Sequence, residues 1–282
     1  MRHAIEMTRA GLASCHPATA LDERGQPREL ELAGERALTL YLDKREIVTL
    51  MTIGAEPELL TLGYLRNQGL VGDLHDILSV QVDWESEAVA VTTRSASEAF
   101  LGKLEKRTVT TGCGQGTAFG RLLDQLRPIE AQGIQVRQST LYDLLNAMRA
   151  FNDVYQRAGA VHGCALCSGS RIDFFVEDVG RHNAVDAIAG YMWLNGIDGE
   201  DKIFYTTGRL TSEMVIKATQ MGIPVLLSRS GLTMMGLELA RQAGLTLIAR
   251  AKGRHFLVFN GEERILFDAI PAEPAPLADS SG

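Results

Sequence analysis

Apolar and polar residues alternate along two short stretches near the start of the chain, Glu29–Leu32 and Leu38–Leu42. A period of two predicts strands that bury one face, and Gly34 lies between the stretches, where a turn is needed. We therefore expect a β-hairpin here. Leu78–Val82 and Ala88–Val91 alternate in the same way and predict a second strand pair.

Two other stretches show helical spacing. Pro57 and Gly69 bracket a leucine-rich stretch, and proline in the first turn with glycine just past the end is a typical pair of helix boundaries. A longer helix is predicted at Thr140–Arg157, with Ser139 as its N-cap and its apolar residues on one face.

Strand-like and helix-like stretches alternate through the second half of the chain. They are Ile172–Glu177, Ala184–Leu194, Ile203–Thr207, Ser212–Met221, Val225–Leu227, Met234–Ala243 and Leu245–Ala249. This alternation predicts an α/β fold with a largely parallel sheet. We place a β-rich N-terminal subdomain at residues 28–135 and an α/β subdomain at 136–265. The polar, aperiodic ends, 1–27 and 266–282, are predicted to be flexible tails.

Composition and charge narrow the class of protein. No apolar run approaches the roughly 20 residues that span a bilayer, and the N-terminal residues lack the apolar stretch of a signal peptide. We therefore expect a cytoplasmic protein with no membrane partner. The net charge of −7 argues against a protein that coats nucleic acid, so nucleic acid is not an expected partner.

Three strand-to-helix turns, Glu177–Asn183, Thr207–Glu213 and Ser228–Thr233, are rich in polar residues. In an open parallel sheet such turns meet at one edge, where helix N-termini offer N–H groups to anions. Guanidinium groups match phosphate oxygens, so the turns together predict a pocket for a phosphate-bearing molecule. For any single turn the alternative is a capped helix with a solvated arginine. The candidate binding residues are Arg181, His182, Asn183, Arg209, Ser212, Ser228, Arg229 and Ser230.

A basic segment follows the last of the predicted α/β strands. It consists of Arg250, Ala251, Lys252, Gly253, Arg254 and His255. Its position after the third polar turn predicts that it adds positive charge to the same phosphate site. A solvated hairpin at the edge of the sheet is the alternative.

Cys113 lies among three glycines in the stretch from Thr108 to Gly116. Glycines of this density are typical of an exposed turn, and backbone N–H groups in such a turn favour the thiolate, which is the reactive form of cysteine. We therefore expect Cys113 to act as a nucleophile. The alternative is a small buried side chain, since free cysteines are often buried.

His162 precedes a Cys-x-x-Cys pair, Cys164 and Cys167. With Cys113 these residues contain the histidine and two thiolates of a zinc deaminase site, but the His-x-Glu signature of such enzymes is absent from the sequence. Packing cysteines are an equally good interpretation. We expect no tightly bound metal, and we expect His162 to serve as a general acid or base.

These stretches together resemble the formate dehydrogenase accessory protein family, FdhD/NarQ, from about Glu29 to Gly261. The resemblance is carried by Glu58–Leu65, the turn around Cys113, Gly159–His162, Glu177–Asp186, Thr207–Met214, Ser228–Ser230 and Arg250–His255. It implies a layered mixed sheet like that of cytidine deaminases. It also implies a sulfurtransferase in which Cys113 carries sulfur as a persulfide, with Arg250–His255 in contact with the guanine dinucleotide cofactor.

The resemblance implies partners as well. The sulfur donor would be a cysteine desulfurase, the acceptor the bis(molybdopterin guanine dinucleotide) cofactor, and the final target a formate dehydrogenase. A homodimer is also expected. Members of the family often have a second cysteine at the position of Gly116, so we hypothesise that Cys164 or Cys167 takes over that partner role here. A zinc-dependent nucleotide deaminase and a non-catalytic cofactor chaperone are the alternative functions.

Overall fold

The computed structural model describes residues 5–94, 128–129 and 134–271. The N-terminal half is built on a five-stranded sheet in the order β1-β6-β7-β4-β5. Its strands are β1 (Glu6–Met7), β4 (Arg36–Leu42), β5 (Arg45–Thr52), β6 (Ile77–Asp83) and β7 (Ala88–Thr93). The predicted pair at 78–91 is confirmed, because β6 and β7 are antiparallel neighbours.

The hairpin predicted around Gly34 is wrong. β3 (Pro27–Ala33) pairs with β2 (Cys15–Leu21), whereas β4 pairs with β5 and β7. The turn before β3 explains the difference, because the carboxylate of Asp22 accepts bonds from the backbone N–H groups of Arg24 and Gln26 and closes a tight connection. Alternation identifies a strand but does not select its partner.

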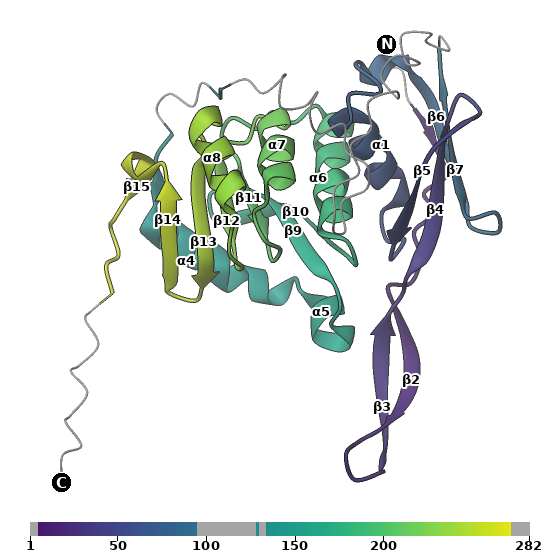
Figure 1. Cartoon of the computed structure of the whole chain (residues 1–282), viewed down its shortest axis with the longest axis horizontal. Coiled ribbons are helices and arrows are strands. Elements are labelled where there is room, and N and C mark those ends of the chain that lie inside the picture. Colours follow the sequence, from purple (N-terminus) through teal and green to yellow (C-terminus); the bar gives the residue numbers. More distant parts are fainter. Residues whose placement is uncertain (1–4, 95–127, 130–133, 272–282) are drawn as a thin grey trace.

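Most of the predicted N-terminal tail is also ordered, because β1 pairs with β6 and β2 pairs with β3. In Figure 1 the β2–β3 ribbon projects from the body of the molecule. At its base the guanidinium of Arg157 donates two hydrogen bonds to the carboxylate of Glu31. The polar, aperiodic sequence of this segment predicts a flexible tail because such residues bury little apolar surface. Backbone hydrogen bonds between paired strands order it instead.

The second half holds a six-stranded sheet in the order β10-β9-β11-β12-β13-β14. Its strands are β9 (His162–Ser168), β10 (Arg171–Asp178), β11 (Ile203–Thr206), β12 (Val225–Ser228), β13 (Thr246–Lys252) and β14 (His255–Asn260). Only β11, β12 and β13 are parallel neighbours. The sheet is therefore mixed, because the tight β9–β10 and β13–β14 connections reverse the chain, at Gly169 and Gly253 respectively.

Helices cover both faces of this sheet. One face packs against α6 (Arg181–Asn195), α7 (Ser212–Gln220) and α8 (Met234–Ala243), and the other against α4 (Gln138–Ala147). A short parallel pair, β8 (Val136–Arg137) with β15 (Ile265–Leu266), lies beside the second core. The α/β class is confirmed by this layering, while the specific resemblance to cytidine deaminases stays a prediction.

The long helix predicted at 140–157 is interrupted. α4 ends at Ala147, a 3₁₀ turn covers Met148–Ala150, and α5 (Asp153–Ala158) begins afresh. The restart has a physical cause, because the carboxylate of Glu177 accepts hydrogen bonds from the first backbone N–H groups of α5, those of Val154 and Tyr155. Ser139 lies inside α4 and donates its hydroxyl to Asp268, so it is not the N-cap.

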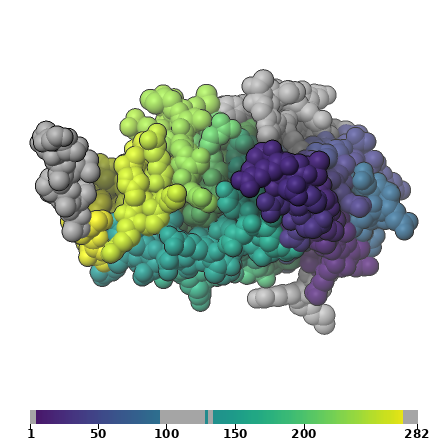
Figure 2. Space-filling model, turned by 90° about the horizontal axis from the view of Figure 1, so that it is seen from below, coloured from purple at the N-terminus to yellow at the C-terminus, as the bar shows by residue number. Residues whose placement is uncertain are grey.

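The helix α1 (Pro57–Asn67) joins the two halves and matches its predicted bounds. It crosses α6 at Gly63 and Gly190, where a Cβ atom would lie 1.7 Å from the Asp186 carbonyl oxygen and 1.9 Å from the Leu59 carbonyl oxygen. One hydrophobic core consequently extends from the five-stranded sheet to the six-stranded sheet. Figure 2 shows the N-terminal strands at one end of the molecule and β14 at the other. Within the described ranges, no helix is long and apolar enough to cross a membrane.

Candidate anion-binding site at one edge of the six-stranded sheet

The three polar turns meet at one edge of the six-stranded sheet. β10, β11 and β12 all end there, and the antiparallel strand β9 begins there with His162. Hydrogen bonds join consecutive segments: the Thr207 N–H donates to the Gly163 carbonyl and the Ser228 hydroxyl donates to the Gly208 carbonyl. The Arg250 N–H donates to the Ser230 carbonyl at 2.8 Å. The predicted juxtaposition is thus present, although β9 separates the first turn from the second.

Arg181 and His182 open helix α6, and both are buried. The Nε of Arg181 and both ring nitrogens of His182 have no hydrogen-bond partner within the described part of the chain. A buried polar atom without a partner is costly, and the N-terminus of a helix of 15 residues adds a positive potential at the same place. An anion bound here would satisfy both groups.

Glu213, in the second turn, lies within ion-pair distance of His182, although Nε2 of His182 forms no hydrogen bond of ordinary geometry. Its carboxylate lies 2.7 Å from Nε2 of His182, and both side chains are buried. The pair leaves Nδ1 of His182 as the ring atom available to a ligand. Sequence reasoning placed Glu213 within a polar turn without assigning it a role, and only the fold shows its contact with His182.

Asn183 and Asp178 maintain the first turn and are not free to bind a ligand. The amide of Asn183 donates to Asp178 Oδ1 at 2.8 Å and to the Met51 carbonyl at 2.6 Å. Asp178 also accepts bonds from the Thr52 hydroxyl and the Gly180 N–H. Burial raises the pKa of Asp178, whereas these three donors and a fourth, the Ile53 N–H, favour its charged form. The prediction that Asn183 contacts a ligand is therefore not supported by its bonding.

His162 lies close to the cationic groups of the first two turns. Burial of its ring, and then the positive charges of Arg181 and Arg209, lower the pKa of His162 below its ordinary value. Arg181 belongs to the first turn and Arg209 to the second, so positive charges from both turns act on His162. Arg209 itself is exposed.

The third turn and the basic segment extend the site. Ser228 is buried, and its hydroxyl accepts a bond from the Ser230 N–H. The guanidinium of Arg229 lies 5.6 Å from the centre of the Tyr155 ring. Arg250 has a left-handed backbone, with φ of 53°, which is uncommon for a residue with a side chain.

Not every predicted residue of the basic segment can reach this edge. Ala251 is 1% exposed and belongs to the core beneath α4, so its side chain is not a ligand contact. Arg254 lies over the Tyr142 ring, 5.3 Å from its centre. Lys252 and His255 face each other across the β13–β14 turn at Gly253. Ser212 is the first residue of α7. The residue before it, Thr211, is partly accessible, but its hydroxyl oxygen is buried and has no hydrogen-bond partner in the described ranges. Sequence reasoning did not single out Thr211.

Burial argues against the hypothesis of a partner role for Cys164 or Cys167, which stays a prediction. Both side chains are fully buried in β9, one in the core beneath α6 and the other in the core beneath α4. Burial raises the pKa of Cys164 to about 12 and that of Cys167 as well. Because they face opposite sides of the sheet, they cannot bind one metal ion. Cys113 lies outside the described residues.

No group of three or more His, Cys, Asp or Glu side chains within the described residues is arranged to hold a metal ion. The zinc site of the deaminase alternative cannot include both thiols of β9, because they face opposite sides of the sheet.

Comparisons with known proteins all lead to the same family. Residues 33–266 match the sequence model of the FdhD/NarQ family. The chain is similar to the sulfur carrier protein FdhD of Wolinella succinogenes, with 28% identity over 82% of this chain and 81% of the relative. It is also similar to that of Listeria monocytogenes serovar 1/2a, with 30% identity over 86% of this chain and 95% of the relative.

The fold has a solved counterpart. A crystal structure from Desulfotalea psychrophila, described as that of a formate dehydrogenase accessory protein, superimposes with a TM-score of 0.72. The two sequences are 27% identical, and the match covers 89% of this chain and 98% of the other.

Proposed function

Because the chain belongs to the FdhD/NarQ family, we propose that it is a sulfur carrier required for the activity of a formate dehydrogenase. Its substrates would be a persulfide on a cysteine desulfurase, as sulfur donor, and the bis(molybdopterin guanine dinucleotide) cofactor, as acceptor. The observation that carries this proposal is the buried cationic edge, where Arg181 and His182 offer unpaired atoms suited to phosphate oxygens.

Cys113 is the proposed carrier of the sulfur. Loading is a thiol exchange: the Cys113 thiolate attacks the outer sulfur of the donor persulfide, the donor's sulfur–sulfur bond breaks, and the donor leaves as a thiolate. The exchange consumes no oxidant. His162 is the candidate general acid or base beside the phosphate site, because its lowered pKa keeps the imidazole neutral near pH 7.

The residues proposed to hold the guanine dinucleotide are those whose positive or hydroxyl groups lie at the shared edge. They are Arg181, His182, Arg209, Ser212, Ser228, Arg229, Ser230 and Arg250, with Lys252, Arg254 and His255 at its margin. Their charges would offset the phosphate charge of a ligand that an acidic protein otherwise repels. A cytoplasmic location, a homodimer and a deaminase-like sheet layering complete the proposal.

The carrier role is tested by mass spectrometry after incubation with cysteine and a cysteine desulfurase. We expect Cys113 to gain the mass of one sulfur atom, about 32 Da on the persulfide route, and the Cys113→Ala variant to lose this product. Cys15→Ser is the matched control, because Cys15 of β2 is a partly accessible thiol, beside Arg157. Unchanged loading of Cys113→Ala, or loading that disappears in Cys15→Ser, would contradict the proposal.

The phosphate site is tested separately, by calorimetric titration with GDP. We expect Arg209→Gln to weaken binding, whereas Arg171→Gln, an exposed arginine paired with Asp173 in β10, should leave it unchanged. The Cys113→Ala variant should bind GDP normally and fail to activate formate dehydrogenase. Activation by that variant would favour the chaperone alternative, and stoichiometric zinc lost on replacing His162 would favour the deaminase.

A further inference from the structure

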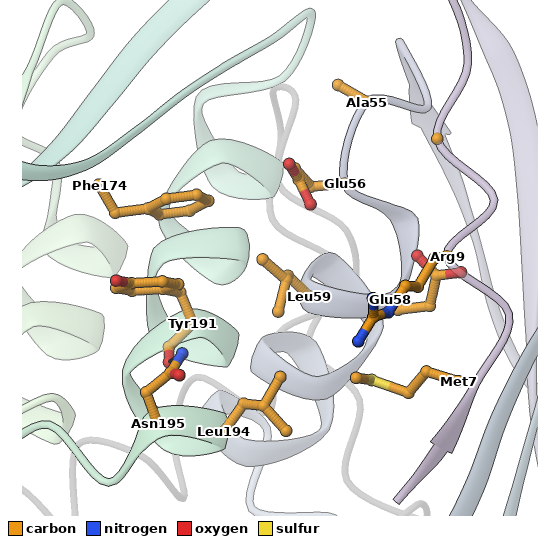
Figure 3. A pocket seen from close by; sticks show the side chains of 11 residues that line it. Met7, Arg9, Ala55, Glu56, Glu58, Leu59, Phe174, Tyr191, Leu194 and Asn195 are labelled. Carbon is orange, nitrogen blue, oxygen red and sulfur yellow. Dashed lines mark hydrogen bonds between the residues drawn. The ribbon is translucent and has the colours of Figure 1, made fainter.

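A cavity lies away from the sheet edge, between α1, α6, β10 and the N-terminal segment. Its volume is about 470 Å³, within the range of small-molecule sites. Ten residues of α6 separate Arg181 from Tyr191 in its wall, a rise of about 15 Å along the helix. Figure 3 shows the cavity, which is lined by Met7, Arg9, Gly11, Ala55, Glu56, Glu58, Leu59, Phe174, Tyr191, Leu194 and Asn195.

One wall of the cavity is built by residues 7–11, and it is firmly attached. The buried carboxylate of Glu58 accepts hydrogen bonds from the Thr8 hydroxyl and the Ala10 N–H, both at 2.7 Å. A Cβ atom at Gly11 would lie 2.7 Å from the Ala55 carbonyl oxygen, so the segment packs directly on the backbone before α1. This wall precedes residue 33, where the match to the family model begins.

Two opposite charges face the cavity without partners. Arg9 has a left-handed backbone, with φ of 58°, between the two residues that Glu58 holds, and its side chain extends into the cavity in Figure 3. Glu56 also lines the cavity, and although the residue as a whole is exposed, partial burial of its carboxyl group and the nearby Glu58 raise the pKa of that group. Within the described ranges, neither Arg9 nor Glu56 forms a side-chain hydrogen bond or ion pair.

Most of the remaining lining is apolar or aromatic, and its polar members, Glu58 and Asn195, already hydrogen-bond within the chain. Met7, Leu59 and Leu194 contribute aliphatic surface. Phe174 of β10 stacks on Tyr191 of α6, with ring centres 4.2 Å apart and planes inclined by 10°. An apolar body of a few carbon atoms or a phenyl ring is therefore the part of a ligand that this surface would bury.

We propose that this cavity binds a free α-amino acid with an apolar side chain. The ammonium group would pair with Glu56, the carboxylate with Arg9, and the side chain would lie on Leu59, Leu194 and Phe174. A ligand with only a negative charge would meet Glu56 and Glu58, and one with only a positive charge would leave Arg9 unpaired. This site goes beyond the proposed sulfur transfer and shares no residue with the phosphate site.

The test is a calorimetric titration with L-phenylalanine and two analogues that each lack one charged group. We expect phenylalanine to bind about tenfold or more tightly than phenethylamine, which has no carboxylate, or 3-phenylpropionate, which has no ammonium. Glu56→Gln and Arg9→Gln should each weaken phenylalanine binding by a similar factor. Glu85→Gln, on the exposed β6–β7 turn, is the matched control and should bind as the native protein does.

Three results would overturn the inference: no binding of phenylalanine at millimolar concentration, equal binding of either analogue, or unchanged binding by Glu56→Gln. Arg9 and Glu56 are both exposed residues, so these variants should fold, and equal melting temperatures would verify it. The outcome is separable from the proposed function, because GDP titration and sulfur loading of Cys113 in the Arg9 and Glu56 variants are expected to remain native.

Discussion

The two cysteines of β9 show how burial governs chemistry at the residue scale. Cys164 packs beneath α6, with its thiol 3.3 Å from the Thr206 hydroxyl, and Cys167 packs beneath α4. The thiolate is the reactive form of cysteine, and the raised pKa of both thiols keeps them protonated near pH 7.

We therefore predict that neither Cys164 nor Cys167 reacts with iodoacetamide in the native protein at pH 8, as measured by peptide mass spectrometry. Cys15, which is partly accessible, serves as the internal positive control. Denaturation in urea should make both β9 cysteines reactive. The Cys164→Ala, Cys167→Ala double variant should load sulfur on Cys113 as the native chain does; impaired loading by a folded variant would restore their partner role.

The lowered pKa of His162 predicts a pH dependence of stability. Between that pKa and about 6.5, the ordinary value, the unfolded chain binds more protons than the folded chain, so stability falls as the pH falls through this window. His162→Gln should remove this part of the acid sensitivity in urea unfolding at several pH values.

A bound phosphate would oppose the charges of Arg181 and Arg209, so NMR titration should show a higher His162 pKa with GDP present. An unchanged pKa would place the anion elsewhere.

At the scale of elements, the crossing of α1 and α6 depends on two glycines. A methyl group at position 63 would lie 1.7 Å from a backbone oxygen of α6, and a backbone cannot move aside as a side chain can. We predict that Gly63→Ala lowers the free energy of unfolding by about 3 kcal/mol, the upper end of typical over-packing costs. Gly72→Ala, at a position with open space, should change it little. Urea unfolding measures both, and equal stabilities would contradict the close crossing.

A buried ion pair ties α7 to the same crossing. The ammonium of Lys217 donates to both oxygens of Asp186, at 2.8 and 2.7 Å, and the amide of Asn67 donates to Asp186 as well. Removing one partner leaves a buried charge, so Lys217→Met should cost about 3–5 kcal/mol in unfolding free energy. The Asp186→Leu, Lys217→Met double variant should recover much of that loss. A double variant no more stable than the single one would show that the loss comes from the missing ion pair and not from the buried, unpaired charge of Asp186.

The elements that sequence reasoning finds are those with local signals. Proline and glycine boundaries identify α1, and apolar runs identify β11, β12 and β13. Strand pairing is not local, which is why β3 was assigned to β4 when it pairs with β2. The break between α4 and α5 depends on Glu177, which is distant in the sequence, so the helical spacing of apolar residues gives no sign of it.

In the candidate site, too, the sequence predicts features with local signals and misses those that depend on tertiary contacts. The polar turns are recognisable because glycine, arginine and hydroxyl residues follow each strand, and the fold brings them to one edge. Which side chain of a turn faces a ligand is a tertiary property. Asn183 is occupied by Asp178, Ala251 faces the core, and Glu213 was left without a role until its contact with His182 was seen.

At the scale of the whole molecule, a chain of net charge −7 presents a cationic edge to an anionic ligand. Salt screens exposed charges strongly and buried charges much less, since the screening length falls from about 30 Å at 0.01 M to about 3 Å at 1 M. Exposed Arg209 and buried Arg181 should therefore differ in how salt changes their contribution to GDP binding.

We predict that Arg209→Gln weakens GDP binding about fivefold at low salt, as expected for an exposed charge pair worth about 1 kcal/mol, and that this difference disappears near 1 M salt. The deficit caused by Arg181→Gln should persist at both salt concentrations, because a buried charge–phosphate contact is shielded from mobile ions. Calorimetric titrations of the native protein and both variants, in low and in high salt, measure the four ratios. A deficit of Arg181→Gln that vanishes in high salt would mean that Arg181 acts only through the long-range field, and the phosphate would then lie outside the buried pocket at the start of α6.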